Sequence, residues 1–211
     1  MIERNQNGLL LVVSGPAGVG KGTINAELMR RHPNIVMSVS ATTRAPRPGE
    51  IDGVHYFFHT EEEFQDLIRK NALLEYVKVF NMNYYGTPRA FVENQLASGH
   101  DVILEIDVQG AAKVRSAFPE AVLVFICPPS MEELKSRLVG RATETPEAIR
   151  RRTEEAYREI RSAGDFYDYA VINESVETAV LQMEAILSAE RDRVPRNRHL
   201  FEELTGGISN D

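Results

Sequence analysis

Residues 9–23 place a glycine-rich loop and a lysine directly after an apolar run, and no other segment constrains the chain as strongly. They read Leu-Leu-Leu-Val-Val-Ser-Gly-Pro-Ala-Gly-Val-Gly-Lys-Gly-Thr, and the residues up to Arg31 have a helical pattern. A strand, such a loop and a helix form a P-loop, whose backbone N–H groups surround a phosphate. The glycines let the backbone approach closely, and the lysine and the helix N-terminus add positive charge. The residues predicted to bind the phosphates of a nucleoside triphosphate are Gly15, Pro16, Ala17, Gly18, Val19, Gly20, Lys21, Gly22 and Thr23.

The loop departs from the pattern G-x-x-x-x-G-K-[ST] at one position. Gly22 stands where a serine or threonine is expected, and Thr23 follows it. An alternative interpretation is a glycine-rich turn that only joins a strand to a helix. The strand before the loop, the helix after it and the lysine in register favour a phosphate-binding loop.

The composition narrows the class of protein further. A chain of 211 residues with 43% hydrophobic residues has room for one domain with an inserted subdomain, or for two domains. The net charge of −7 argues against a broad nucleic-acid surface. Arg44 and Arg47 lie close in sequence, and further arginines crowd residues 137–152. Such local clusters in an acidic protein suit small phosphate ligands, although some of these arginines are expected to be solvated.

No feature of the sequence indicates a membrane or an oxidising compartment. No apolar stretch approaches the ~20 residues that span a bilayer, and residues 1–8 lack the pattern of a signal peptide. The single cysteine, Cys127, has no partner for an internal disulfide and fits a reducing compartment. We therefore expect a cytoplasmic protein without a membrane partner.

Four short apolar runs predict buried parallel strands, and helical segments separate or follow them. This order is typical of the α/β class, here a P-loop NTPase-type parallel sheet flanked by helices. Thr60 with Glu63 and Ser130 with Glu133 predict capping boxes, and threonines before Pro88 and Pro146 predict two more helix starts. The predicted strands cover Leu9–Val13, Val102–Ile106, Val122–Ile126 and Tyr169–Ile172.

Residues 35–97 differ in character from the rest. Val36–Ala41 and Val54–His59 look like strands of mixed polarity, and the prolines between them exclude regular structure. We predict a core domain at 1–34 and 98–189, a mixed α/β insertion at 35–97, a helical lid at 140–158 and a C-terminal tail at 190–211.

The insertion contains side chains suited to a phosphorylated acceptor. Arg44 and Arg47, in a turn stiffened by proline and glycine, can bind one phosphate together. Glu75 lies in an otherwise apolar stretch. A buried carboxylate there suits the N1–H and N2–H donors of guanine, whereas adenine presents an acceptor at N1.

At these residues the sequence resembles the guanylate kinase family. The similarity runs from about Leu9 to Leu187 and includes S-V-S-x-T-T-R-x-P-R-x-G-E, G-x-x-Y-x-F, N-Y-Y-G-T, D-x-Q-G, P-P-S and G-R-x-T-E. The resemblance implies ATP-dependent phosphorylation of GMP, and of dGMP, with Mg²⁺. It implies a GMP site of Ser40, Arg44, Arg47, Glu50, Tyr56, Glu75, Tyr85, Thr87 and Asp107.

The resemblance also implies individual roles. Ser40, Glu75 and Thr87 would read guanine, and Glu50 would brace the arginines. Asn173 would face the adenine of ATP. Asp107 would lie near the acceptor or order metal-bound water. The implied catalytic residues are Lys21, Arg44, Arg137, Arg141 and Arg152.

The sequence departs from the family pattern near the phosphates. Gly22 takes the position of a residue whose hydroxyl usually approaches Mg²⁺. Adenylate kinases have the same G-K-G-T sequence, so the loop can still work without this hydroxyl. A second departure is Glu105, which stands where aspartate is common. We expect phosphates and water to hold Mg²⁺, with Thr23 and Asp107 as possible ligands. The remaining alternatives are a non-catalytic guanylate-kinase-like binding module and a kinase for another phosphorylated acceptor.

Overall fold

The computed structural model describes residues 7–79, 82–139 and 146–206 of the chain. Its centre is a five-stranded sheet with the strand order β2-β7-β1-β8-β9, and all neighbouring pairs are parallel. The four strands predicted from apolar runs lie in this sheet, with ends that differ by at most one residue. The strands are β2 (Ile35–Met37), β7 (Asp101–Glu105), β1 (Leu10–Ser14), β8 (Val122–Cys127) and β9 (Tyr169–Ile172).

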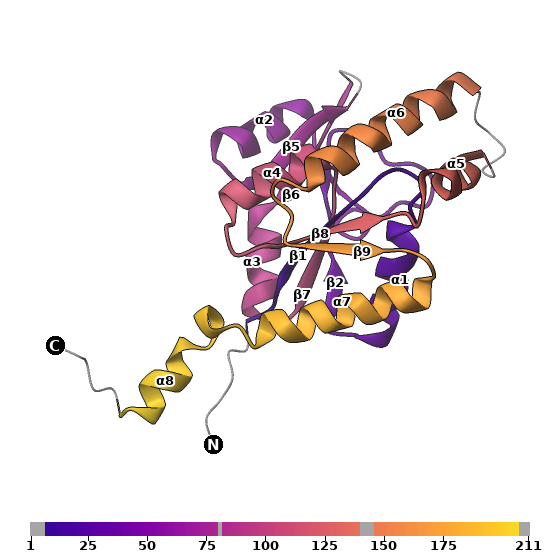
Figure 1. Cartoon of the computed structure of the whole chain (residues 1–211). Helices are drawn as coiled ribbons and strands as arrows, with labels where there is room; N and C mark the ends of the chain where they lie inside the picture. Colours follow the sequence, from indigo (N-terminus) through magenta and orange to yellow (C-terminus); the bar gives the residue numbers. More distant parts are fainter. Residues whose placement is uncertain (1–6, 80–81, 140–145, 207–211) are drawn as a thin grey trace.

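Helices cover both faces of this sheet, as predicted (Figure 1). On one face, apolar side chains of the sheet pack with Ile24, Leu134 and Met183, which come from three different helices. On the other face they pack with Val92 and Val114. The helices of the first face are α1 (Lys21–Arg31), α5 (Met131–Val139) and α7 (Val176–Arg191), and those of the second are α3 (Arg89–Ala97) and α4 (Val108–Ala117).

A second, mixed sheet has the order β4-β3-β6-β5 and packs with α2 (Glu61–Arg69) around Phe64. Its strands are β4 (Phe57–Phe58), β3 (Ala41–Thr42), β6 (Asn83–Pro88) and β5 (Leu73–Val79). The predicted single strand Val36–Ala41 is wrong. Its first residues pair with β7 in the large sheet, while Ala41 pairs with Gly86 in the small one. The chain crosses between the sheets here, which accounts for the mixed polarity.

Helix ends follow the predicted signals unevenly. Thr60 and Glu63 form the predicted capping box of α2. The Ser130 hydroxyl accepts the N–H of Glu133, but the Glu133 carboxylate pairs with Arg137. A long helix, α6 (Pro146–Ala163), follows. None of the described helices is long and apolar enough to cross a membrane.

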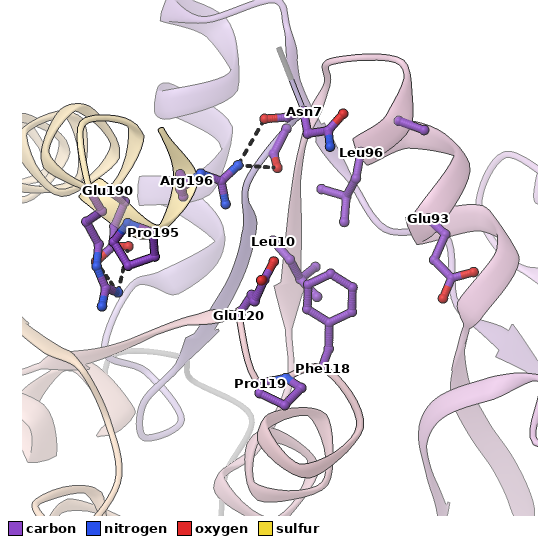
Figure 2. A pocket seen from close by; sticks show the side chains of 13 residues that line it. Asn7, Leu10, Glu93, Leu96, Phe118, Pro119, Glu120, Glu190, Pro195 and Arg196 are labelled. Carbon is purple, nitrogen blue, oxygen red and sulfur yellow. Dashed lines mark hydrogen bonds and ion pairs between the residues drawn. The ribbon is translucent and has the colours of Figure 1, made fainter. Parts of the chain in front are cut away.

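The segment after α7 is attached through Arg196 to the end of the sheet where β1 begins. It contains the short helices η1 (Val194–Arg196) and α8 (Arg198–Leu204). The Arg196 guanidinium donates to the carbonyls of Asn7 and Gly8, both at 3.0 Å. Figure 2 shows these bonds at the edge of a cavity of about 410 Å³ with Leu96 and Phe118 in its wall. This cavity lies at the opposite end of β1 from the P-loop.

Candidate active site

The predicted P-loop joins β1 to α1, and its glycines are required by the geometry. Gly15 has φ +148°, and a Cβ there would lie 2.4 Å from the carbonyl oxygen of Ile126. Gly20 is the N-cap of α1 in the left-handed conformation, and no side chain caps this helix. The Lys21 ammonium donates to the Gly15 carbonyl at 2.5 Å and to that of Pro16 at 3.4 Å. The loop, the helix N-terminus and the lysine thus converge as the sequence predicts.

Two predicted site residues lie against the P-loop at Val19. The side-chain amide of Asn173 donates to the Val19 carbonyl at 2.7 Å and is 4% exposed. The guanidinium of Arg137 donates to the same carbonyl and to the backbone carbonyl of Asn173, both at 3.3 Å. Asn173 directly follows β9, and Arg137 lies on α5, so two separate elements hold one peptide of the loop.

On the insertion, Arg44 and Glu50 form an ion pair with two hydrogen bonds, of 2.8 and 3.0 Å. Glu50 also accepts the backbone N–H of Arg47 at 2.7 Å. The hydrogen bond from Arg44 is the main reason that the pKa of Glu50 falls to about 2, and the Arg47 N–H adds to it. Glu50 therefore holds the arginine turn in place, as the resemblance implies. Arg47 itself is exposed.

Aromatic rings complete this side of the site. The Arg44 guanidinium lies 5.3 Å from the centre of the Tyr56 ring, within the range of a cation–π contact. Tyr56 and Tyr85 meet edge to face at 6.0 Å. Tyr84 instead stacks on Phe64 in the core of the small sheet. The two neighbouring tyrosines of β6 therefore point to opposite faces of the small sheet, as strand alternation requires.

A buried carboxylate lies on β5 of the small sheet. Glu75 is 7% exposed and accepts a hydrogen bond of 2.8 Å from the Thr87 hydroxyl. Burial raises the pKa of Glu75, and the bond from Thr87 opposes this shift. Thr87 lies in β6 and does not cap α3, whose N-cap is Pro88, so the predicted capping role of Thr87 is wrong. The hydroxyl is turned to Glu75 because the strand continues through residue 88.

One cavity lies between the insertion and the end of β7. It has a volume of about 270 Å³, and Ser40, Tyr56 and Thr87 line it together with Glu105. The Glu105 carboxylate accepts a hydrogen bond of 2.9 Å from Asn25 on α1. A residue at the end of β7 thus lies between the predicted acceptor site and the helix that begins at the P-loop. From the sequence, Glu105 stands out only as a departure from the family pattern, and Asn25 does not stand out at all.

Oxygen donors for a metal ion lie at the same end of the large sheet. Asp107 is the N-cap of α4 and accepts the Gly110 N–H at 2.7 Å. A Cβ at Gly22 would lie 3.9 Å from a Glu105 carboxylate oxygen, so this carboxylate is close to the position that lacks a hydroxyl. Such oxygens suit Mg²⁺. Among the described residues no three His, Cys, Asp or Glu side chains form a metal-binding group.

Helix α6 brings a further part of the predicted lid to the loop. Arg152, with Ala17 of the P-loop, lines a cavity of about 510 Å³. Arg141 lies outside the described residues. Burial raises the pKa of Glu159 on α6 to about 7, while the charge of Lys21 opposes the shift. Sequence reasoning missed Glu159, because no local pattern distinguishes it from the solvated glutamates of the same helix.

The fold and the candidate site are those expected of a nucleotide-binding protein, because a glycine-rich loop with a lysine joins β1 to α1 and a second sheet carries an arginine turn. The family model "Guanylate kinase" matches residues 7–190. A guanylate kinase of Clostridioides difficile is 49% identical over 198 residues, which cover 94% of this chain and 96% of the relative. One of Halalkalibacterium halodurans is 52% identical over 202 residues, covering 94% and 98%. The crystal structure of guanylate kinase from Anaplasma phagocytophilum matches with a TM-score of 0.71 and 36% identity, covering 97% and 98%. The chain belongs to the guanylate kinase family.

Proposed function

We propose that this protein transfers the γ-phosphoryl group of ATP to GMP, giving ADP and GDP, and that dGMP is also a substrate. The relatives named guanylate kinase support this reaction because they match almost the whole chain. The observation that carries the proposal is the cavity shared by Ser40, Thr87 and Glu105. Through the bond from Asn25 to Glu105, this cavity adjoins the P-loop helix, as transfer between two bound nucleotides requires.

Phosphoryl transfer leaves the protein little covalent work beyond alignment and charge neutralisation. Lys21 and the loop amides would bind the β- and γ-phosphates of ATP. Arg44, with Arg47, Tyr56 and Tyr85, would bind the phosphate of GMP. Arg137, Arg141 and Arg152 would neutralise the group in transfer. Because the GMP phosphate is already ionised at neutral pH, the reaction needs no strong general base.

Guanine selection falls to the buried carboxylate. Ionised Glu75 would accept hydrogen bonds from N1–H and N2–H of guanine, with Ser40 and Thr87 beside it. Adenine presents an acceptor at N1, which would repel the carboxylate oxygen and leave it without a hydrogen-bond donor. A polar group left unpaired in a buried site is a strong basis for rejecting the wrong ligand.

Mg²⁺ is the proposed cofactor, and when bound it would supply positive charge for the transfer. Thr23 and Asp107 are the candidate protein ligands, with Glu105 in reach of the same region. We also propose that the insertion at 35–97 and the lid at 140–158 close on the core domain and exclude water from ATP. We propose that the reaction takes place in the cytoplasm, because a chain with a single cysteine has no internal disulfide and suits a reducing compartment.

The test is ADP release from ATP measured side by side with GMP, AMP, CMP and UMP. Of the four monophosphates, we expect only GMP to give rapid ADP release from ATP. Release with another monophosphate instead would identify a kinase for a different acceptor. ATP binding without release in any mixture would identify a non-catalytic binding module.

A further inference from the structure

Asn173 is placed to control the shape of the P-loop. Its backbone N–H donates to the Cys127 carbonyl at 2.8 Å, and its side-chain Nδ2 donates to the Val19 carbonyl at 2.7 Å. The residue is 4% exposed. Its two bonds therefore join the end of β8 to the loop between β1 and α1. We infer that Asn173 is a positioning residue for the triphosphate site, acting through the Val19–Gly20 peptide. This inference rests on the proposed function and makes it more specific.

The peptide geometry explains how a bond to a carbonyl can matter for a phosphate. In a planar trans peptide the C=O and the following N–H point in opposite directions. Because Nδ2 of Asn173 holds the Val19 carbonyl, the Gly20 N–H is directed away from Asn173. Inward-pointing N–H groups of this kind are what a P-loop offers to phosphate oxygens.

Gly20 makes this control necessary. Glycine populates both signs of φ with similar ease, so the Val19–Gly20 peptide would rotate readily without an external partner. The observed φ at Gly20 is +103°, and a Cβ there would lie 2.4 Å from Nδ2 of Asn173. The amide of Asn173 therefore packs directly against the residue that precedes Lys21.

Arg137 holds the same peptide from a second side. It donates to the Val19 carbonyl and to the backbone carbonyl of Asn173, each at 3.3 Å. Both bonds are longer than the 2.7 Å bond from Asn173. Since Arg137 is also a proposed transfer residue, the bond from Asn173 is the one that stays in place if Arg137 moves to the phosphates.

The test measures binding of ATP and of inorganic tripolyphosphate to the full-length protein and to Asn173→Ala by calorimetry. Tripolyphosphate has the same phosphate chain without the adenosine. We expect Asn173→Ala to weaken both ligands by the same factor, about tenfold, the scale of one buried hydrogen bond. GMP binding should not change, because Asn173 does not line the cavity of Ser40 and Thr87. Asn94→Ala, at an exposed position on α3, is the matched control.

Two results would overturn the inference. Weaker binding of ATP with unchanged binding of tripolyphosphate would make Asn173 a residue that reads adenine. Unchanged binding of both, with only a lower melting temperature, would make its role one of stability. If Asn173→Ala does not fold, Asn173→Ser is measured in the same way. Failure of the wild-type protein to bind ATP would instead contradict the proposed function.

Discussion

Arg44 and Glu50 are joined by two parallel hydrogen bonds, and the side chains of the pair are only 15% and 17% exposed. The same carboxylate accepts the Arg47 N–H. A guanidinium held in this way keeps its planar face and its direction before any phosphate arrives. The pair is therefore pre-formed within the proposed acceptor site.

Glu50→Gln should raise the KM for GMP about tenfold, the effect of losing a charge-assisted hydrogen bond, and should change kcat little. The reason is that Arg44 loses its fixed direction but keeps its charge. Steady-state kinetics with GMP varied at saturating ATP measure both constants. Glu62→Gln, an exposed change on α2, is the control, and equal KM values in the two variants would remove Glu50 from the site.

Glu75→Gln should impair GMP use and stabilise the protein. Burial raises the pKa of Glu75, so its ionised form is disfavoured in the folded state. A raised pKa gives stability that is present below the unfolded-state value and is lost as the pH rises through the folded-state value. At pH 7.5 the variant replaces a disfavoured buried charge by a neutral amide and should be more stable. Each ~1 kcal/mol gained in the free energy of unfolding should raise Tm by about 2–4 °C.

The same variant should lower kcat/KM for GMP about 100-fold, because one of the two oxygens proposed to accept from guanine becomes a donor. ATP affinity should stay as in the wild-type protein. Kinetics and a thermal melt on the same sample provide both readouts. A variant with reduced Tm and normal GMP kinetics would show that Glu75 is only structural.

Gly20→Ala should reduce ATP affinity at least about tenfold, because left-handed backbone costs an L-residue ~1–2 kcal/mol and the new Cβ clashes with Asn173, so the loop has to leave the observed conformation. The clash distance would be 2.4 Å. Gly164→Ala is the control, because a Cβ there would meet only the Arg161 carbonyl at 3.9 Å. Calorimetric titration with ATP measures the affinity. An affinity within twofold of wild type would show that the loop does not require glycine at position 20.

Much of this arrangement follows from local sequence patterns. The P-loop glycines, the four buried strands and the capping box at Thr60 each depend on neighbours within a few residues, so sequence periodicity and spacing reveal them. The opposite directions of Tyr84 and Tyr85 follow from strand alternation in the same way.

What the sequence did not reveal depends on pairing between distant segments. Ile35–Met37 and Ala41–Thr42 belong to different sheets, and only their partners β7 and β6 distinguish them. Thr87 has the spacing of a cap, yet its hydroxyl binds Glu75 across the small sheet. The placement of Asn173 against Val19 likewise requires β9 and β1 to lie in one sheet.

Glu159→Gln should stabilise the protein at alkaline pH and have little effect in acid. Burial raises the pKa of Glu159 from 4.5 to about 7. The stability that this group contributes is present below about pH 4.5 and is lost as the pH rises through about 7. Thermal melts should therefore give equal Tm values near pH 4.5 and a higher Tm for the variant at pH 8.5. Glu154→Gln, an exposed glutamate on the same helix, should follow the wild-type curve, and an identical curve for Glu159→Gln would contradict the pKa shift.

The proposed reaction requires the phosphates of ATP and GMP to bind next to each other, and a ligand with adenosine and guanosine joined through five phosphates tests this directly. Calorimetry should give one molecule bound per chain, more tightly than ATP or GMP alone, and weaker binding in both Lys21→Ala and Arg44→Ala. Binding no tighter than that of ATP, and unaffected by Arg44→Ala, would contradict the account.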